Sequence, residues 1–248
     1  MASSTTPNSG GRVAVRGDWP GPITLRRGWA RAEARPWNDT HTEAHLRLVR
    51  GGSGFLADAA SVMLGLGAPR VLSPPLPASA QSIWRQARFE TSVELALLRL
   101  ELDRSPGSID HLVKEGSLDD LDEALRIDDA AFDPFWRMDR RGLLEAIEAT
   151  PVTRILVVHG EGSRLAAFAV LGFGSALAYL QRIAVDPQWQ GRGIGRSVVR
   201  SCIRVARARG SRAILLNTQV DNGPALNLYA AEGFVTMREP LEVLQDTA

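Results

Sequence analysis

One segment, residues 186–196 (Asp-Pro-Gln-Trp-Gln-Gly-Arg-Gly-Ile-Gly-Arg), constrains the fold more than any other part of the chain. It follows an apolar stretch typical of a strand and leads into residues with the apolar spacing of a helix. Its glycines allow the backbone to turn tightly and to approach a ligand closely. Unpaired amides at a helix start attract phosphates. The segment therefore predicts an α/β protein with a phosphate-binding turn, and a plain helix-entry turn is the structural alternative.

Three phosphate-binding motifs compete for this turn. A P-loop requires Lys and then Ser or Thr after its last glycine, whereas Arg-Ser follows Gly195 here. A dinucleotide-binding fingerprint requires G-x-G-x-x-G and an acidic residue about 20 positions later. The glycine spacing in this chain is shorter, and residues 215–217 are Leu-Leu-Asn. The pattern that remains is Q/R-x-x-G-x-G/A, which residues 190–195 match.

Two neighbouring blocks accompany this pattern in a fixed order. Residues 180–187 read Leu-Gln-Arg-Ile-Ala-Val-Asp-Pro, and residues 222–234 read N-x-x-A-x-x-L-Y-x-x-x-G-F. With these three blocks the chain resembles the GNAT superfamily of N-acetyltransferases over residues 108–248. The resemblance implies an α/β fold of the α+β type, in which helices flank a mixed, splayed β-sheet, and it implies acetyl-CoA as the acyl donor. Residues 1–107 resemble only a smaller, degenerate GNAT-like half-domain.

The resemblance also assigns residues to the cofactor. The backbone of the strand before the turn would pair with the pantetheine amides, as an added strand does. The turn would hold the diphosphate, and Asn222 would contact the cofactor from the next loop, unless it only caps a helix. The implied cofactor-binding residues are Ile183, Ala184, Val185, Gln190, Gly191, Arg192, Gly193, Ile194, Gly195, Arg196 and Asn222.

Tyr229 is the implied catalytic residue. Transfer of acetyl from sulfur to an amine expels a thiolate, and a phenol can donate a proton to it. The structural alternative is an aromatic side chain packed on Phe234. The general base is open, because Tyr179 stands where some relatives that acetylate protein N-termini carry Glu. Four acidic residues on the expected acceptor side remain as candidates, although each is more typical of a solvated or capping carboxylate: Asp128, Asp129, Asp133 and Asp139.

The charges are distributed unevenly along the second half of the chain. Residues 115–150 contain 11 acidic and 4 basic side chains, and residues 190–212 contain 7 basic and no acidic ones. The acidic segment favours an amine acceptor, on a small molecule, a protein N-terminus or a lysine. Arg196, Arg200 and Arg204 recur every four residues, which is typical of a solvated helix face. Arg196 also lies near enough to the helix start to reach a CoA phosphate.

Composition narrows the function classes further. The net charge is +1, which disfavours a dedicated nucleic-acid binder. Cys202 is the only cysteine, so no internal disulfide forms and a cytoplasmic protein is expected. Its apolar neighbours predict a buried small residue and not a nucleophile. No stretch resembles a signal peptide or membrane helix. We expect no metal, no membrane and no nucleic-acid partner; a homodimer stays open.

The domain organisation follows from turn signals. Ser-Pro-Gly-Ser at 105–108 marks a boundary, which predicts a flexible tail at 1–20, a GNAT-like domain at 21–106 and a catalytic domain at 107–248. An offset of 145 residues aligns Trp84 with Tyr229 and Phe89 with Phe234, in accord with an internal repeat, although chance similarity is the rival explanation.

Spacing predicts the individual elements. Helices are expected at 55–66, 83–87, 118–131, 138–148, 193–209 and 224–232. Strands are expected at 23–25, 44–49, 93–102 (with helix as an alternative), 109–114, 155–158, 165–171, 179–185, 213–216 and as a pair within 234–244.

Two functions from different classes remain. The first is an acetyl-CoA-dependent N-acetyltransferase that transfers acetyl to a primary amine by direct attack on the thioester; a longer acyl donor is a variant of it. The second is a non-catalytic acyl-CoA-binding module. Tyr229 favours the enzyme, because binding alone needs no proton donor for a thiolate.

Overall fold

The computed structural model describes residues 11–37, 43–162 and 164–246. The chain divides into two units: the first extends to Val93 and takes in the chain from Glu242 onward, and the second is Glu94–Leu241. This boundary differs from the one predicted at residues 106 and 107. Strand β6 (Phe89–Glu101) begins in the first unit and ends in the second, and the last strand belongs to the first. The boundary between the units depends on strand pairing between segments far apart in the chain, so it could not be predicted from local composition.

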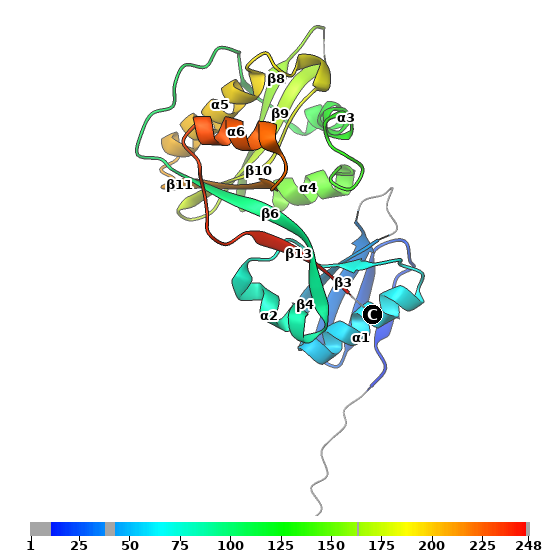
Figure 1. Ribbon diagram of the computed structural model, residues 1–248. Helices are drawn as coiled ribbons and strands as arrows, with labels where there is room; N and C mark the ends of the chain where they lie inside the picture. The colour runs from blue at the N-terminus through cyan, green and yellow to red at the C-terminus, as the bar shows by residue number, and fades with distance from the viewer. Residues whose placement is uncertain (1–10, 38–42, 163, 247–248) are drawn as a thin grey trace, which may run out of the picture. The chain divides into compact units, whose positions relative to one another are not determined.

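The first unit is a mixed sheet with strand order β1-β2-β3-β4-β5-β13. Strands β4 and β5 are parallel and are joined by α1, which lies along the sheet (Figure 1). The apolar face of α1 buries Phe55, Leu56 and Met63 in the core of this unit. The elements are β1 (Ala14–Arg16), β2 (Ile23–Arg27), β3 (Ala30–Pro36), β4 (Ala44–Arg50), α1 (Ser53–Gly65), β5 (Val71–Leu72), α2 (Ala78–Gln86) and β13 (Leu241–Asp246).

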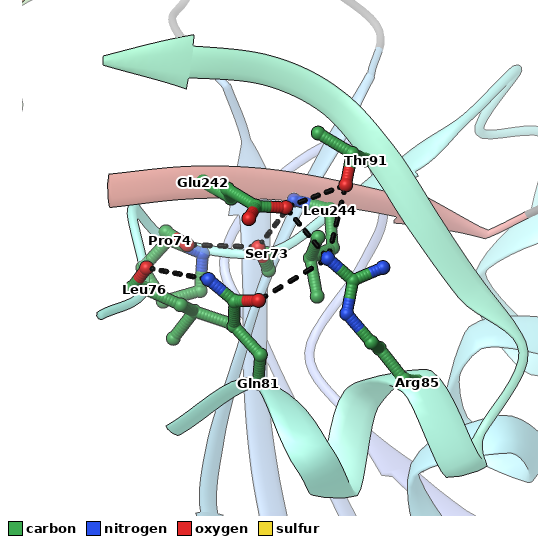
Figure 2. Close-up of polar contacts among 8 residues, drawn as sticks. All are labelled: Ser73, Pro74, Leu76, Gln81, Arg85, Thr91, Glu242 and Leu244. Atoms are coloured by element: carbon green, nitrogen blue, oxygen red, sulfur yellow. Dashed lines mark hydrogen bonds and ion pairs between the residues drawn. The ribbon is translucent and has the colours of Figure 1, made fainter. Parts of the chain in front are cut away.

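Hydrogen bonds from backbone and side chains hold β13 in the first unit (Figure 2). The Ser73 N–H donates to the Leu244 carbonyl oxygen, and the Leu244 N–H donates to the Ser73 hydroxyl, each at 2.8 Å. Leu76 and Glu242 exchange two backbone hydrogen bonds. The Glu242 carboxylate also pairs with the Arg85 guanidinium at 2.7 Å. The first unit therefore depends on a strand from the far end of the chain.

Replacing Ser73 with alanine is expected to lower the free energy of unfolding by about 1–3 kcal/mol, because it leaves the buried Leu244 N–H without its acceptor. Urea unfolding followed by tryptophan fluorescence measures the loss. The matched control is Ser61→Ala, since the exposed Ser61 hydroxyl bonds only the Ala57 carbonyl of its own helix. We expect the control to change stability by less than roughly 0.5 kcal/mol. Equal stability of the two variants would contradict the role given to Ser73.

The second unit is a mixed sheet with strand order β6-β11-β10-β9-β8-β7, in which β12 also pairs with β6. Over the described residues of this sheet, β10 and β11 are parallel and the other neighbouring strands are antiparallel. The elements are β7 (Lys114–Glu115), α3 (Leu121–Ala131), α4 (Arg140–Glu148), β8 (Val152–His159), β9 (Leu165–Phe173), β10 (Leu177–Val185), α5 (Ile194–Ala208), β11 (Ala213–Gln219), α6 (Gly223–Ala231) and β12 (Val235–Thr236), with 3₁₀ turns at Leu118–Asp120 and Pro187–Trp189.

Helices cover both faces of this second sheet, with α5 and α6 on one side and α3 and α4 on the other (Figure 1). Strand β9 is buried along its whole length, because successive side chains point to opposite faces. Ala169 and Leu171 pack in the core beneath α5, whereas Phe168 and Val170 pack beneath α3 and α4. The predicted α/β fold with helices flanking a mixed sheet is confirmed.

The two units repeat one arrangement. In each, a strand, a helix and a parallel strand are followed by a short helix: β4-α1-β5-α2 in the first and β10-α5-β11-α6 in the second. Each short helix carries an aromatic ring that packs on a phenylalanine five residues later. The ring centroids of Trp84 and Phe89 are 4.9 Å apart, and those of Tyr229 and Phe234 are 5.6 Å apart. This correspondence agrees with the internal repeat.

Several predicted elements need correction. The strand expected at 109–114 is reduced to the two residues of β7, and residues 109–113 have no regular secondary structure. The two strands expected within 234–244 are present, but they do not pair with each other, since β12 pairs with β6 and β13 with β5. Part of the predicted tail at 1–20 is the strand β1, and residues 1–10 lie outside the described residues. Residues 93–102 form a strand, so the helix alternative is wrong. The remaining predicted helices and strands are present, with ends shifted by a few residues.

Candidate functional site

The parallel strands β10 and β11 separate from each other. Their register pairs run from Leu177 with Ala213 to Tyr179 with Leu215 and extend no further within the described residues. Beyond that point β10 continues along β9 as far as Val185, after an irregularity between Leu180 and Arg182. The edge of β10 over 183–185 that faces away from β9 is therefore left unpaired by β11, which is the predicted splay.

A cleft opens at this splay. It is lined by all but one of the predicted residues, the exception being Arg192. The lining therefore brings together the β10 edge, the Gly-rich turn, the Asn222 loop and Tyr229. Six further lining residues were not predicted: Ala131, Phe132, Trp189, Pro224, Ala225 and Leu228. Trp189, Pro224, Ala225 and Leu228 lie within the quoted motifs, so their positions carried a signal. Ala131 and Phe132 come from the end of α3 and are brought in by folding alone.

The turn between β10 and α5 has the backbone of an anion-binding loop. Gly191 and Gly193 have φ of 75° and 80°, in the left-handed region that favours glycine. Gly193 is the N-cap residue of α5, and no side chain caps this end of the helix. The first N–H groups of α5 therefore donate to no capping side chain. The residues that carry them line the cleft. Gly195 is the second helical residue, and a Cβ there would lie 3.5 Å from the side chains of Val185 and Leu228.

Tyr229 lies on α6 with only 5% of its surface exposed and faces the cleft. Burial raises the pKa of its phenol, because the charged phenolate loses solvation. The hydroxyl therefore keeps its proton at neutral pH. Its ring also packs against Phe234, as the structural alternative expected. This packing involves only the ring, so it is compatible with a role of the hydroxyl as a proton donor.

Comparison with known proteins identifies the family of the domain that contains this site. The model of the acetyltransferase (GNAT) family matches residues 121–234. Residues 121–234 form a GNAT acetyltransferase domain. That stretch contains the Gly-rich turn, the splayed strands and Tyr229, while the rest of the chain lies outside the family match.

Relatives in sequence are acetyltransferases. A Bacillus subtilis protein, provisionally named a [ribosomal protein bS18]-alanine N-acetyltransferase, is 26% identical over 121 residues, which are 49% of this chain and 78% of that protein. The mycothiol acetyltransferase of Pseudarthrobacter chlorophenolicus is 31% identical over 124 residues, 50% of this chain and 35% of that protein. The chain thus spans about a third of the length of the second relative. The GNAT domain is of the N-acetyltransferase class.

Solved structures extend the likeness in fold to both units. A tandem GNAT protein from the clavulanic acid biosynthesis pathway superposes with a TM-score of 0.62 at 15% identity, covering 94% of this chain and 83% of that one. A GNAT protein of Sphaerobacter thermophilus gives a TM-score of 0.60 at 15% identity, over 92% and 80%. Both coverages include the first unit, so its fold is also GNAT-like.

Gln190 and Asn222, both predicted to bind the cofactor, also make hydrogen bonds within the GNAT domain. The Gln190 side chain donates from Nε2 to the Val185 carbonyl oxygen at 3.0 Å, which ties the turn back to the end of β10. Asn222 caps α6, since its Oδ1 accepts from the Ala225 N–H at 3.2 Å. Asn222 also lines the cleft, so its capping role and its predicted contact with the cofactor are compatible.

The carboxylates considered as bases all have structural partners. Asp139 caps α4 through the Gly142 N–H, Asp133 accepts from the Phe135 N–H, and Asp129 pairs with Arg137 at 2.9 Å. Asp128 is fully buried and pairs with Arg182. None of the four lines the cleft as described.

Asp128 and Arg182 form a buried ion pair beside the cleft. The Arg182 guanidinium donates to both carboxylate oxygens, at 2.5 and 2.7 Å, and to the Trp136 carbonyl oxygen at 2.8 Å. Its planar face lies 3.5 Å from the centre of the Phe132 ring. Asp128 also accepts from the Met138 N–H at 2.7 Å. The pair therefore fixes the loop between α3 and α4, and with it the Phe132 wall of the cleft.

Asp186 fixes the other end of the β10 strand. Burial opposes its ionisation, but the hydrogen bonds from Arg126 (2.6 Å) and from the Gln188 N–H hold the pKa of Asp186 below its usual value. Arg126 also donates to the Leu165 carbonyl oxygen. Asp186 thus anchors the start of the Gly-rich segment to α3 and β9 and does not face the cleft.

The arginine stripe of α5 is bonded within the GNAT domain and its flanking segment. Arg196 and Arg200 both pair with Glu232 at the end of α6, at 3.1 and 2.8 Å, and the Glu232 side chain is only 5% exposed. Arg204 donates to the Gly107 carbonyl oxygen. The expected solvated face therefore holds for Arg204, which is exposed, and is wrong for Arg200, whose side chain is largely buried in its pair with Glu232. Cys202, on the opposite face, is buried, and burial raises the pKa of its thiol to about 12, in accord with a core residue.

The structure also bears on membrane and metal sites. Among the described residues, no helix is both long and apolar enough to cross a membrane. Over the same residues, His, Cys, Asp and Glu side chains do not gather in groups of three that could hold a metal ion.

Proposed function

We propose that the GNAT domain binds acetyl-CoA in this cleft and transfers its acetyl group to a primary amine, carried by a small molecule, a protein N-terminus or a lysine. One observation carries the proposal: the unpaired edge of β10, the Gly-rich turn and Tyr229 line a single cleft. An extended ligand with a diphosphate at one end and a thioester at the other matches that order of chemical groups.

The residues present fit acetyl-CoA. The β10 edge at 183–185 offers backbone groups to the pantetheine amides, as an added strand would. The uncapped start of α5 and the left-handed glycines offer N–H groups and a helix dipole to the diphosphate. Arg196 and Asn222 border the same region and supply polar side chains.

The chemical step is direct transfer. The neutral amine attacks the thioester carbonyl, a C–N bond forms, and the C–S bond breaks with both electrons leaving on sulfur. Backbone N–H groups of the 183–185 strand stabilise the oxyanion. Tyr229 donates its proton to the thiolate and is then reprotonated by solvent. Its raised pKa suits a group that must hold a proton until the thiolate forms.

The four aspartates considered as the general base do not serve to remove the amine proton. Asp128, Asp129, Asp133 and Asp139 are each engaged in ion pairs or helix and turn capping. We therefore propose that this proton passes to a water molecule, which backbone carbonyl oxygens orient by accepting its hydrogen bonds, and from there to solvent. An amine of low pKa, such as an α-amino group, is neutral to a larger extent at pH 7–8 than a lysine and would react faster.

Release of free thiol from acetyl-CoA over a panel of amines tests the proposal. The panel contains peptides with free N-termini, polyamines, amino acids and aminated antibiotics, since the relatives act on a ribosomal-protein alanine and in mycothiol acetylation. We expect acceleration by at least one class. Tight binding of CoA without thiol release on any amine would favour the acyl-CoA-binding module instead.

Replacing Gly195 with leucine is expected to weaken CoA binding roughly 10-fold or more, because the side chain would fill the space between Val185 and Leu228 in the cleft. Calorimetric titration with CoA measures the change. The control is Gly54→Leu, since Gly54 is likewise the second residue of its helix but has open space around it. Unchanged CoA affinity in folded Gly195→Leu protein would contradict the placement of the diphosphate turn.

A further inference from the structure

The segment that joins β6 to β7 lies along the polar face of α5. Arg204 donates to the Gly107 carbonyl oxygen at 3.2 Å, and Arg200 donates to the Ser108 carbonyl oxygen at 2.7 Å. One turn further toward the helix start, the His111 N–H donates to the Ser197 hydroxyl at 3.3 Å. We call residues 107–111 the strap. It follows α5 toward the Gly-rich turn.

The strap ends on the turn itself. His111 Nε2 lies 2.8 Å from the Arg192 carbonyl oxygen. A carbonyl oxygen only accepts, so Nε2 carries the hydrogen and donates it. The same nitrogen would lie 3.8 Å from a Cβ placed on Gly193, so the imidazole sits against the turn on both sides of the 192–193 peptide bond.

This contact controls the direction of one backbone amide. In a planar trans peptide the C=O and the N–H point in opposite directions. Holding the Arg192 carbonyl toward His111 therefore turns the Gly193 N–H the other way. Glycine tolerates φ of either sign, so without a restraint the 192–193 peptide has a flipped orientation open to it. His111 selects one of the two.

The start of α5 lacks the restraint that a helix usually receives from its N-cap, since Gly193 has no side chain to cap it. The turn is held instead by three side-chain contacts: Gln190 on the Val185 carbonyl oxygen, the Arg192 guanidinium 4.9 Å from the Trp189 ring centre, and His111 on the Arg192 carbonyl oxygen. None of the three uses a backbone amide of the turn, so these amides stay available to a ligand. Of the three, only His111 bonds the backbone of the turn.

We propose that His111 is a positioning residue for the diphosphate-binding turn: through the Arg192 carbonyl it sets the orientation of the Gly193 amide toward the acetyl-CoA diphosphate. The inference rests on the proposed function, because it assumes that the diphosphate occupies this turn. It adds a residue outside the three motifs, supplied by the strap that precedes the family match at residue 121.

Calorimetric titration of His111→Ala with CoA tests the proposal. One neutral hydrogen bond is lost, so we expect CoA affinity to fall roughly 3- to 10-fold. His111→Gln should recover most of the affinity, because the glutamine amide places an N–H donor where Nε2 lies. Leu112→Ala is the matched control: it is the next residue, its side chain is 73% exposed, and its CoA affinity should equal that of the unaltered protein.

A truncated donor separates positioning of the turn from a general structural effect. S-acetylpantetheine lacks the diphosphate and the nucleotide, so its rate of thiol release should be the same in His111→Ala and in the unaltered protein. The KM for acetyl-CoA should rise while kcat stays constant. Equal losses with both donors, or an unchanged CoA affinity in His111→Ala, would overturn the inference alone. Failure of the unaltered protein to bind CoA would overturn the proposed function as well.

Discussion

Tyr229→Phe protein is expected to bind acetyl-CoA normally and to transfer acetyl roughly 10²–10⁴-fold more slowly than the unaltered protein. The substitution keeps the ring that packs on Phe234 and removes only the hydroxyl of this cleft-lining residue. Steady-state kinetics on the best amine of the panel, together with a CoA titration, measure the two effects separately. Tyr179→Phe is the control, because Tyr179 is the only other tyrosine and is not among the cleft-lining residues. Full turnover by Tyr229→Phe would assign the proton donation to water.

The pH dependence follows from the direction of the Tyr229 pKa shift. A general acid loses its function as the pH rises through its pKa, and burial moves that pKa upward. The rate should therefore rise with pH as the amine loses its proton and show no fall due to the phenol between pH 7 and about 10. An ordinary exposed phenol would begin to lower the rate at the top of that range.

Arg182→Gln is expected to lower the free energy of unfolding by about 3–5 kcal/mol, because it leaves the fully buried Asp128 carboxylate without its charged partner. For a chain of this size the loss corresponds to a fall in Tm of roughly 6–20 °C. Urea and thermal unfolding measure it. The Phe132 ring loses the guanidinium on which it stacks, so the KM for the amine should rise in whatever folded fraction remains.

Two comparisons isolate the buried charge in this prediction. The double variant Asp128→Asn with Arg182→Gln should recover part of the stability, since no uncompensated charge is left in the interior. Asp122→Asn removes one partner of the exposed pair with Arg140, in which the carboxylate again comes from α3, and should cost less than about 1 kcal/mol. A loss for Arg182→Gln as small as that for Asp122→Asn would contradict the role of the pair.

The local geometry of the turn could be predicted from the amino-acid sequence alone. Left-handed glycines, a helix start without a capping side chain and the tyrosine of the following helix are local properties. They depend on the backbone preferences of neighbouring residues and on apolar spacing over one or two helical turns. Gly193 could thus be predicted as a ligand-binding position, and Tyr229 as a residue of the same site, before any tertiary contact was known.

Contacts between groups far apart in the chain could not be predicted from the sequence, because they depend on the folded structure. The Asp128–Arg182 pair joins residues 54 positions apart, His111 meets the Arg192 carbonyl across 81 positions, and Leu244 bonds Ser73 across 171. A carboxylate, an imidazole or a serine has the same local signal whether it is solvated or buried with a partner. Pairing of this kind is set by strand order and packing, which depend on the whole chain. For the same reason the boundary between the two units lies within β6 and not at the Ser-Pro-Gly-Ser turn.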